Sequence, residues 1–284
     1  MKILVLGGTG MGGHTIALYF KEKGYEVVSF SRKPFLLTDN IIGDVFDSEK
    51  LKSILLEQNF DVVINCIGIL NKDAEDNPSK AVYLNSYLPH FIAYILAGSK
   101  TKLIHMSTDC VFEGNSGPYL ENSFCNGKTF YDRSKALGEV NDKKNLTFRN
   151  SIIGPDMHEN GIGLFNWFMK QNDVINGFTG AIWTGVTTLT LAKAMEKAIE
   201  QNLCGLYNLV NNDSISKFDL LKLFNINFKK DQLIINKEEN FKLDKTLKNT
   251  RTDFNFLVPS YEQMIQEMRE WIENHKDLYK HYKM

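Results

Sequence analysis

A glycine-rich turn after the first apolar run constrains the fold more than any other feature of this sequence. Ile3 to Leu6 are apolar, Gly7, Gly10 and Gly13 follow them, and an amphipathic segment covers 15–23. Glycine allows a tight turn and lets backbone N–H groups and a helix N-terminus approach a diphosphate without a Cβ in the way. A strand, this turn and a helix in that order predict a βαβ unit that binds a dinucleotide.

Apolar runs alternate with helical patterns through the first half of the chain. The predicted strands are 3–6, 27–30, 62–64 and 103–106, and the predicted helices are 15–23, 48–58, 79–99 and 131–140. Pro89 lies inside the third helix, which is therefore either kinked or divided. Strict alternation predicts parallel strands with right-handed crossovers, and hence a doubly wound sheet.

The pattern changes after the apolar run 146–153. Gly and Asn recur from Gly154-Pro155 to Gly180, where we expect a small irregular insertion. A helix over 189–201 and a strand over 206–210 return the chain to the main sheet, and 211–259 mixes short strands with charged, solvated runs. A terminal helix that faces the core is predicted from apolar residues at helical spacing: Tyr261, Met264, Ile265, Met268, Trp271 and Ile272.

The composition is that of a folded globular protein without a strong charge bias. Of 284 residues, 43% are hydrophobic and 24% are charged, which excludes a largely disordered or fibrous chain. Lys and Arg number 33 against 34 Asp and Glu, so no basic field favours nucleic acid or an anionic membrane as a partner. No apolar stretch approaches a membrane span, and the first is too short for a signal peptide.

Cysteines and histidines form no metal or disulfide pattern in the sequence. The four cysteines are far apart and include no CxxC pair: Cys66, Cys110, Cys125 and Cys204. This usage fits the reducing cytoplasm, which is the predicted location. No second ligand stands at metal-binding spacing beside His14, His90 or His105, so we assign no metal site.

The end of the second predicted strand favours NADPH as the cofactor and leaves NADH open. An acidic residue at this point binds the ribose 2′-hydroxyl, whereas a basic residue accommodates a 2′-phosphate. The sequence here is Ser31-Arg32-Lys33, and the planar guanidinium of Arg32 would pair with phosphate or stack on adenine. The alternative is an exposed Arg-Lys turn without a ligand.

A tyrosine and a lysine stand four residues apart in Tyr131-Asp132-Arg133-Ser134-Lys135. On a helix this spacing puts both side chains on one face. A nearby positive charge lowers the pKa of a tyrosine and makes the phenol a usable proton donor or acceptor. The pair follows the fourth or fifth strand and lies downstream of Ser107-Thr108-Asp109, where a hydroxyl could bind a carbonyl oxygen.

Nearly the whole chain resembles the extended short-chain dehydrogenase/reductases, and within them the dTDP-4-dehydrorhamnose reductase-like sugar-nucleotide enzymes. The matching segments are Gly7 to Gly13, Gly43-Asp44-Val45, Asn65 to Gly68, Asn85, Ser107 to Phe112, Tyr131 to Lys135 with Gly138-Glu139, and Arg149 to Pro155. The implied fold is a Rossmann-type doubly wound α/β sheet with a smaller, discontinuous C-terminal substrate-binding domain. We predict the NAD(P)-binding domain at 1–154 with about 180–210, and the substrate-binding domain at about 155–179 and 211–284.

The resemblance also implies roles for single residues. Thr108, Tyr131 and Lys135 match the catalytic set: Tyr131 would protonate the substrate oxygen, Lys135 would lower the tyrosine pKa and hold the nicotinamide ribose, and Thr108 would orient the keto group. For Asn85 a hydrogen bond inside a helix is an equal alternative. The implied cofactor residues are Gly7, Thr9, Gly10, Met11, Gly12, Ser31, Arg32, Lys33, Asp44 (at the adenine), Val45, Cys66, Ile67, Gly68, Asn85, Tyr131, Lys135 and Ile152.

The predicted substrate residues are Thr108, Asp109, Cys110 and Trp183. The family reductases usually have Tyr at the position of Cys110 and an aromatic residue near Ile152, so the nucleotide, the sugar and the product stereochemistry stay open. Trp183 is flanked by small and hydroxyl residues and is expected to stack on the substrate, with a core position as the alternative.

Cys110 also raises the alternative of a second activity. In the related GDP-fucose synthases a Cys at this position is an acid/base in 3,5-epimerisation and has a His partner. The only His between Tyr131 and the terminal helix is His158, which is too close to Tyr131 in sequence for that match. We therefore interpret Cys110 as a small apolar residue that lines the pocket.

These features predict NADPH-dependent reduction of a nucleotide-linked 4-keto-6-deoxy sugar, in deoxysugar supply for a surface polysaccharide. Two alternatives stay open: an epimerase or bifunctional 3,5-epimerase/4-reductase that uses Cys110, and a non-catalytic NADP-binding protein that docks a partner, like the regulatory subunit of methionine adenosyltransferase. The intact Thr108, Tyr131 and Lys135 favour the enzyme. A homodimer and a metal dependence also stay open.

Overall fold

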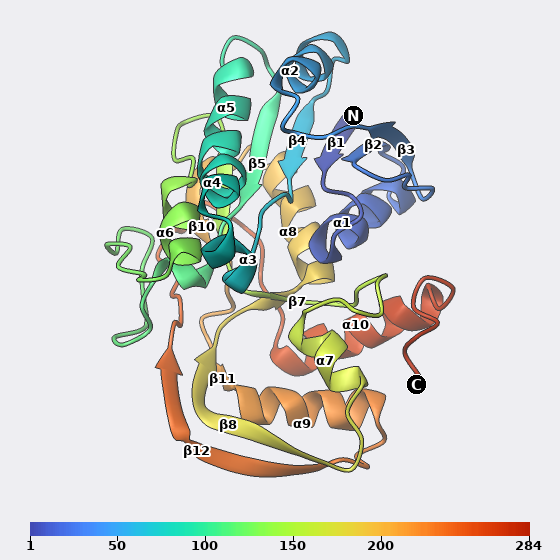
Figure 1. Cartoon of the computed structure of the whole chain (residues 1–284), viewed down its shortest axis with the longest axis vertical. Helices are drawn as coiled ribbons and strands as arrows, with labels where there is room; N and C mark the ends of the chain where they lie inside the picture. The colour runs from blue at the N-terminus through green and yellow to red at the C-terminus, as the bar shows by residue number, and fades with distance from the viewer.

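The centre of the protein is a seven-stranded parallel sheet, seen in a computed structural model that describes residues 1–284 (Figure 1). The strand order is β10-β6-β5-β4-β1-β2-β3, and every neighbouring pair is parallel. The chain runs outward from β1 in both directions, which confirms the predicted doubly wound sheet. The strands are β1 (Lys2–Leu6), β2 (Glu26–Ser31), β3 (Asp39–Ile42), β4 (Val62–Asn65), β5 (Lys102–Met106), β6 (Leu146–Arg149) and β10 (Gly205–Asn208).

Helices cover both faces of this sheet because successive strand residues point to opposite sides. Ile3 and Val5 of β1 join a hydrophobic cluster with α1 (Met11–Glu22) and α8 (Thr188–Glu200). Leu4 and Leu6 join a second cluster on the opposite face. That face is covered by α2 (Ser48–Glu57), α5 (Leu88–Ile95) and α6 (Phe130–Leu137), with the short α3 (Asn71–Asp76) nearby.

The helical segment predicted over 79–99 is divided, as Pro89 indicated. It consists of α4 (Pro78–Ala81), the π-helix η1 (Val82–Tyr87) and α5. Pro89 has no N–H, so it cannot donate to the carbonyl of Asn85 four residues earlier, and the wider π-helical turn lies at this point. The Asn85 carbonyl faces Gly138 at the end of α6, where a Cβ would lie only 1.8 Å from the Asn85 oxygen. Asn85 therefore lies at the closest approach of η1 and α6.

A second, smaller sheet has the order β11-β8-β12 and lies below the central sheet in Figure 1. β8 is parallel to β12 and antiparallel to β11. Two short strands on either side of β8 in the sequence, β7 and β9, pair with each other in parallel. The remaining elements are η2 (Asp109–Val111), β7 (Ile152–Ile153), α7 (Leu164–Met169), β8 (Val174–Trp183), β9 (Val186–Thr187), β11 (Ile215–Ser216), α9 (Lys217–Phe228), β12 (Ile234–Asp244) and α10 (Tyr261–Asn274).

The structure corrects two sequence predictions in this part of the chain. The expected irregular insertion contains the ten-residue strand β8, and the region expected to hold only short strands contains the twelve-residue helix α9 and the eleven-residue strand β12. The glycines that suggested irregular structure instead allow neighbouring elements to pack closely against the strand. A Cβ on Gly177 of β8 would lie 2.8 Å from the Cα of Phe218, so glycine lets α9 pack directly on the strand.

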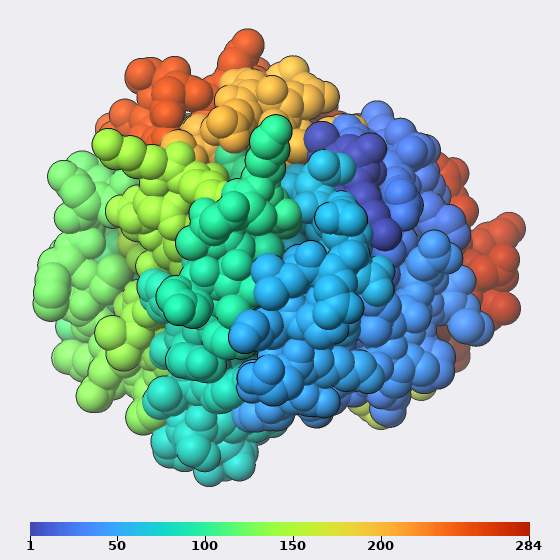
Figure 2. All heavy atoms as spheres, turned by 90° about the horizontal axis from the view of Figure 1, so that it is seen from above, coloured from blue at the N-terminus to red at the C-terminus, as the bar shows by residue number.

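The predicted terminal helix is confirmed as α10, whose six predicted apolar residues are all buried. Its buried side chains join the cluster of α1 and α8, which also includes residues of β8 and α9. Viewed from above, residues of the first half, blue to green, form most of the visible surface, and orange and red segments lie at its margins (Figure 2). No helix is long and apolar enough to cross a membrane. The domain boundaries given above remain a prediction.

Candidate active site

The glycine loop between β1 and α1 is a tight turn that needs glycine. Gly7 has a φ of 84°, and its N–H donates to the carbonyl of Phe30 at 2.9 Å. Gly10 donates to the carbonyl of Gly7 at 3.0 Å, and α1 begins at the next residue. A Cβ on Gly13 would lie 2.2 Å from the Gly7 oxygen. The loop thus presents the N-terminus of α1 with no Cβ in the way, which is the geometry that binds a diphosphate.

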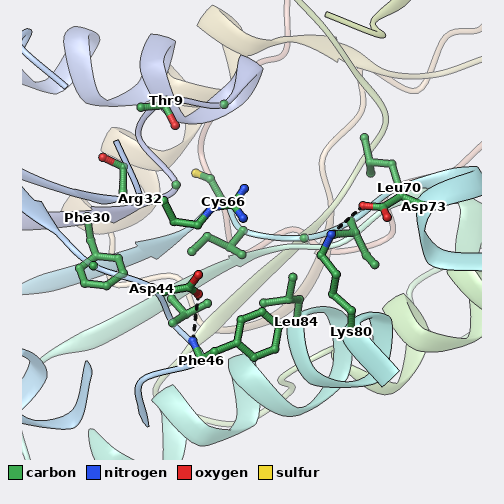
Figure 3. A pocket seen from close by; sticks show the side chains of 18 of the residues that line it. Thr9, Phe30, Arg32, Asp44, Phe46, Cys66, Leu70, Asp73, Lys80 and Leu84 are labelled. Carbon is green, nitrogen blue, oxygen red and sulfur yellow. Dashed lines mark hydrogen bonds and ion pairs between the residues drawn. The ribbon is translucent and has the colours of Figure 1, made fainter. Parts of the chain in front are cut away.

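A cavity of about 400 Å³, the glycine-loop cavity, opens beside this turn (Figure 3). It gathers ten of the predicted cofactor residues: Gly7, Thr9, Gly10, Ser31, Arg32, Asp44, Val45, Cys66, Ile67 and Gly68. Sequence reasoning missed the other lining residues, which come from distant segments: Phe30, Gly43, Phe46, Ile69, Leu70, Asp73, Lys80, Leu84 and Ile162. Lys33 lies outside it, in an adjacent groove that also includes His158.

The charged groups of the cavity suit the adenosine end of a dinucleotide phosphate. The side chain of Arg32 points into the cavity and forms no salt bridge within the chain (Figure 3). Asp44 uses one carboxylate oxygen to accept the N–H of Phe46 at 3.1 Å. Lys80, by contrast, is paired with Asp73 at 3.0 Å. Arg32 is therefore an unpaired cation at the cavity, as the predicted 2′-phosphate contact requires, and the cradle fits the predicted cofactor.

Several of the other predicted cofactor residues lie outside the glycine-loop cavity, near the end of β5 or the start of α1. A Cβ on Gly12 would lie 3.4 Å from Met106 and 3.5 Å from Ile152, and Met11 lies 3.0 Å from the Cβ position of Gly163. The Lys135 ammonium donates to the carbonyl of Met106 at 2.6 Å. It also lies 4.0 Å from the Cβ position of Gly68, a cavity-lining residue. Lys135 is thus beside the cavity.

Helix α6 carries Tyr131 and Lys135, both of them buried. A reciprocal capping box starts the helix: Thr129 accepts the Asp132 N–H at 3.1 Å, and Asp132 accepts the Thr129 N–H at 3.2 Å. The Tyr131 N–H donates to the carboxylate of Glu75 at 3.1 Å. These contacts fix the first turn of α6, and with it the position of the phenol.

Asn85 is fully buried, and its amide group is occupied by protein partners. Its oxygen accepts the Ile69 N–H at 2.9 Å, and its nitrogen donates to the Ile69 carbonyl and to the Ser134 hydroxyl, each at 3.0 Å. Ser86 next to it donates to the Ser134 carbonyl at 2.7 Å. Asn85 therefore ties the segment after β4 to α6, which is a positioning function; its predicted cofactor contact remains a prediction.

Thr108 and Asp109 follow β5 and are buried beside Tyr131. The Thr108 hydroxyl accepts the Cys110 N–H at 3.2 Å and donates to the Asp109 carboxylate at 3.1 Å. The same hydroxyl lies beside Tyr131 and acts to lower the tyrosine pKa. Burial raises the pKa of Asp109, and the positive charge of Lys217 opposes that rise. The structure thus brings the three predicted catalytic residues to one point.

The pKa of Tyr131 corrects the prediction from spacing. Burial raises it well above its ordinary value, neighbouring Cys110 adds to the rise, and the Thr108 hydroxyl opposes it. Lys135 was expected to lower this pKa, but its ammonium is directed to the Met106 carbonyl. Burial lowers the pKa of Lys135 itself to about 8, against the opposing charge of Glu139. The phenol is therefore fully protonated at neutral pH.

A buried ion pair lies behind this site. Glu139 binds Arg149 through both carboxylate oxygens, at 2.8 and 2.6 Å, and it accepts the Ser107 hydroxyl at 2.6 Å. The Arg149 side chain is almost completely buried. Because Ser107 precedes Thr108 and Glu139 lies one turn after Lys135, this pair connects β6 to the ends of β5 and α6, where the predicted catalytic residues lie.

Two predicted substrate residues have an unexpected neighbour, Lys217. Burial raises the pKa of Cys110 to about 12, so its thiol is protonated at neutral pH, in keeping with a pocket-lining residue. Trp183 is 3% exposed, and the Lys217 ammonium lies 4.6 Å above its ring. Sequence analysis missed Lys217 because it missed α9; the available signal was Ser216 followed by Asp219, a helix N-cap pattern.

No group of three or more His, Cys, Asp or Glu side chains could hold a metal ion. His158, the one histidine that sequence analysis weighed as an acid/base partner for Cys110, lies in the groove with Arg32 and Lys33. The predicted site residues therefore divide into a cofactor region at the glycine loop and a catalytic region at the ends of β5 and α6.

Comparisons with known proteins agree with this arrangement. The RmlD substrate binding domain family matches residues 1–283. A probable low-salt glycan biosynthesis reductase of Haloferax volcanii is 32% identical over 232 residues, which cover 77% of each chain. Methionine adenosyltransferase 2 subunit beta of Xenopus laevis is 25% identical over 77% of this chain and 70% of its own length. The solved structure of dTDP-4-dehydrorhamnose reductase from Bacillus anthracis, in complex with NADP, has a TM-score of 0.79 at 19% identity and covers 96% of this chain and 99% of that one. The resemblance seen in the sequence is thus confirmed, and the chain belongs to the RmlD substrate binding domain family.

Proposed function

We propose that this protein reduces the keto group of a nucleotide-linked 4-keto-6-deoxy sugar with NADPH, in deoxysugar supply for a surface polysaccharide. The observation that carries the proposal is the gathering of Thr108, Tyr131 and Lys135 beside the glycine-loop cavity. Relatives named as a glycan biosynthesis reductase and as dTDP-4-dehydrorhamnose reductases support the substrate class. Four free cysteines support a cytoplasmic location.

The glycine loop and Arg32 would hold the diphosphate and the 2′-phosphate of the cofactor, and Lys135 would hold its nicotinamide ribose. When bound, NADPH supplies a hydride to the carbonyl carbon. Thr108 and the neighbouring Tyr131 then face the carbonyl oxygen, so that Thr108 orients it by a hydrogen bond. The domain that includes β8 and α9 would bind the nucleotide sugar.

Tyr131 has the protonation state that this reaction requires. Its raised pKa keeps the phenol protonated at neutral pH. As the carbonyl carbon is reduced, the phenolic proton moves to the substrate oxygen, and the phenolate later takes a proton from water. The high pKa of Tyr131 keeps the phenol protonated until the substrate oxygen takes the proton. A cation brought near the phenol would ease this proton transfer.

The alternatives have less support from the site. The Cys110 thiol, with its pKa near 12, is a poor base for epimerisation, and no histidine faces it. A purely regulatory role, suggested by the similarity to methionine adenosyltransferase 2 subunit beta, does not require the complete Thr108, Tyr131 and Lys135 set. The homodimer remains a prediction.

The test is NADPH oxidation, followed by its absorbance, with dTDP-, UDP- and GDP-linked 4-keto-6-deoxy sugars made by their 4,6-dehydratases. Turnover with one of them supports the proposal and identifies the nucleotide. NADPH binding without reduction of any member would exclude the 4-ketoreductase and favour a cofactor-binding regulatory protein.

A further inference from the structure

A groove of about 430 Å³ adjoins the glycine-loop cavity, and Thr9 and Arg32 line both of these hollows. Figure 3 shows the two side chains from the side of the cavity. The other polar residues of the groove are Lys33 and His158, and the rest of its wall is apolar. A ligand bound at Thr9 and Arg32 can therefore extend from the cavity into the groove.

The groove is lined by three basic side chains and by no carboxylate. Arg32, Lys33 and His158 form no salt bridge and no side-chain hydrogen bond within the chain. An imidazole donates a hydrogen bond in either protonation state, so all three side chains can donate to an anion. The glycine-loop cavity, by contrast, contains the carboxylates of Asp44 and Asp73. An anionic group of the ligand is therefore expected on the groove side of Arg32.

The turn that carries His158 is fixed by hydrogen bonds to the second half of the chain. Asp156 accepts the His158 N–H at 2.8 Å, and the His158 carbonyl accepts the Gly161 N–H at 2.9 Å. The buried amide of Asn166 on α7 donates to the carbonyls of Glu159 and Gly161, at 2.9 and 2.7 Å. These contacts hold the backbone of His158 at the groove before any ligand binds.

The opposite wall of the groove is fixed as well. The Ser31 hydroxyl donates to the Lys33 carbonyl at 2.7 Å. Asn40 of β3 donates to the same hydroxyl at 3.0 Å and accepts the Phe35 N–H at 3.1 Å. The turn after β2 therefore presents Arg32 and Lys33 from one side, and the turn after β7 presents His158 from the other.

The 2′-phosphate of NADPH is the anionic group that fits this arrangement. A phosphate monoester carries about 1.5 to 2 negative charges at pH 7 and accepts several hydrogen bonds. It is attached to the adenosine ribose, and the predicted adenine residue Asp44 lines the cavity on the other side of Arg32. The diphosphate of the cofactor belongs at the glycine loop, so it leaves the groove open for the 2′-phosphate.

We propose that the groove is the 2′-phosphate subsite and that His158, together with Lys33, determines the preference for NADPH over NADH. This inference rests on the proposed function, because it takes NADPH as the cofactor. It adds to Arg32 a residue from the β7–α7 connection, which lies far from the glycine loop in the sequence.

The test compares two ligands that differ only in this phosphate, adenosine 2′,5′-bisphosphate and adenosine 5′-phosphate, by calorimetry. His158→Leu removes the donor, so we expect about 3- to 10-fold weaker binding of the bisphosphate and unchanged binding of the monophosphate. Lys33→Met should have a similar effect, and His158→Lys should restore most of the affinity. The matched control is Lys170→Met, which removes an exposed positive charge at the end of α7, outside both hollows.

Fluorescence titration with the complete cofactors gives a second measurement. His158→Leu should weaken NADPH binding about 3- to 10-fold and leave NADH binding as it is. Because His158 is exposed, the variant should unfold in urea like the unchanged protein.

Equal affinity of His158→Leu and the unchanged protein for the bisphosphate would overturn the assignment of His158. Equal weakening of both adenosine ligands would also overturn it, because the turn would then support the whole nucleotide. If the unchanged protein binds both ligands equally and reduces a keto sugar with NADH, the subsite fails and the reductase stands. A loss confined to the bisphosphate, without reduction of any keto sugar, would support the subsite and refute the reductase.

Discussion

At the scale of single residues, the protonated phenol of Tyr131 leads to the most direct prediction. Tyr131→Phe removes only the hydroxyl and should lower kcat about 10²- to 10⁴-fold, the usual contribution of a positioned proton donor. NADPH affinity, measured by fluorescence titration, should stay the same. The control is Tyr94→Phe, because Tyr94 is 77% exposed on α5. Retained turnover in Tyr131→Phe would show that another group supplies the proton.

The lowered pKa of Lys135 predicts how the rate depends on pH. Lys135 is an ammonium below about pH 8 and a neutral amine above it, because burial disfavours its charged form. Only the ammonium can attract the ribose oxygens by its charge. Measured at saturating substrate, kcat should therefore fall as the pH rises through about 8.

Two variants assign this alkaline limb to a residue. Lys135→Arg stays charged at high pH, so the limb should vanish even where the overall rate is reduced. Lys217 has a similar lowered pKa of about 8, so Lys217→Met should retain the limb if Lys135 causes it. A limb that vanishes in Lys217→Met alone would contradict the assignment.

Sequence patterns were enough to propose the catalytic and cofactor residues because the spacing of these residues is local. Tyr131 and Lys135 are one helical turn apart, and the glycine loop occupies seven consecutive residues. The tyrosine pKa was predicted in the wrong direction because burial depends on elements far away in the sequence. Lys217 was missed for the same reason: only the packing of α9 on β8 brings it near Asp109.

At the scale of secondary-structure elements, the contact of η1 with α6 positions the catalytic helix. A Cβ at Gly138 would lie 1.8 Å from the Asn85 carbonyl, so Gly138→Ala must push α6 away from η1. Overpacking of this kind usually costs about 1–3 kcal/mol, which urea unfolding would measure as a lower free energy of unfolding. We also expect lower kcat, because Tyr131 and Lys135 move with α6.

Gly98 provides the matched control for this prediction, since a Cβ there would meet nothing within 4 Å. Gly98→Ala should leave both the unfolding free energy and kcat close to those of the unchanged protein. Equal behaviour of the two variants would mean that the approach of η1 to α6 does not position the site.

The elements of the first half were predictable because strands and helices alternate there with clear hydrophobic periods. In the second half, the glycines did not show whether a segment was a strand or a loop. Gly177 and Gly180 lie inside the long strand β8, where they give room to neighbouring elements rather than break the strand. That function depends on the packing partner, which a single sequence does not specify.

At the scale of the whole molecule, the C-terminal tail connects the glycine loop to α10. The Nδ1 of buried His14 lies 3.0 Å from the Gly10 carbonyl, and its Nε2 lies 2.8 Å from the Tyr279 hydroxyl. Burial lowers the pKa of His14 to about 4, so the ring is neutral and carries its proton on Nδ1, since a carbonyl can only accept. Tyr279 thus donates to His14 and accepts the Trp271 N–H at 3.2 Å.

Because one hydrophobic cluster runs through β1, α1, α8, β8, α9 and α10, we expect the two sheets to unfold together. The three tryptophans, Trp167, Trp183 and Trp271, all lie outside the central sheet, so their fluorescence reports on the second part of the chain. Far-UV circular dichroism reports on all helices and strands. In urea the two signals should give the same midpoint.

Tyr279→Phe tests whether the tail contributes to this joint unfolding. The variant leaves the indole N–H of Trp271 buried without a partner, and it leaves the Nε2 of His14 with only the Thr15 hydroxyl at 3.5 Å. It should therefore lower the free energy of unfolding by about 1–3 kcal/mol. Because Tyr279 joins α1 to α10, both midpoints should shift together, while the exposed control Tyr94→Phe should shift neither. A tryptophan midpoint that falls alone would mean that the second sheet unfolds as a separate unit, held to the central sheet mainly by this hydrogen-bonded chain.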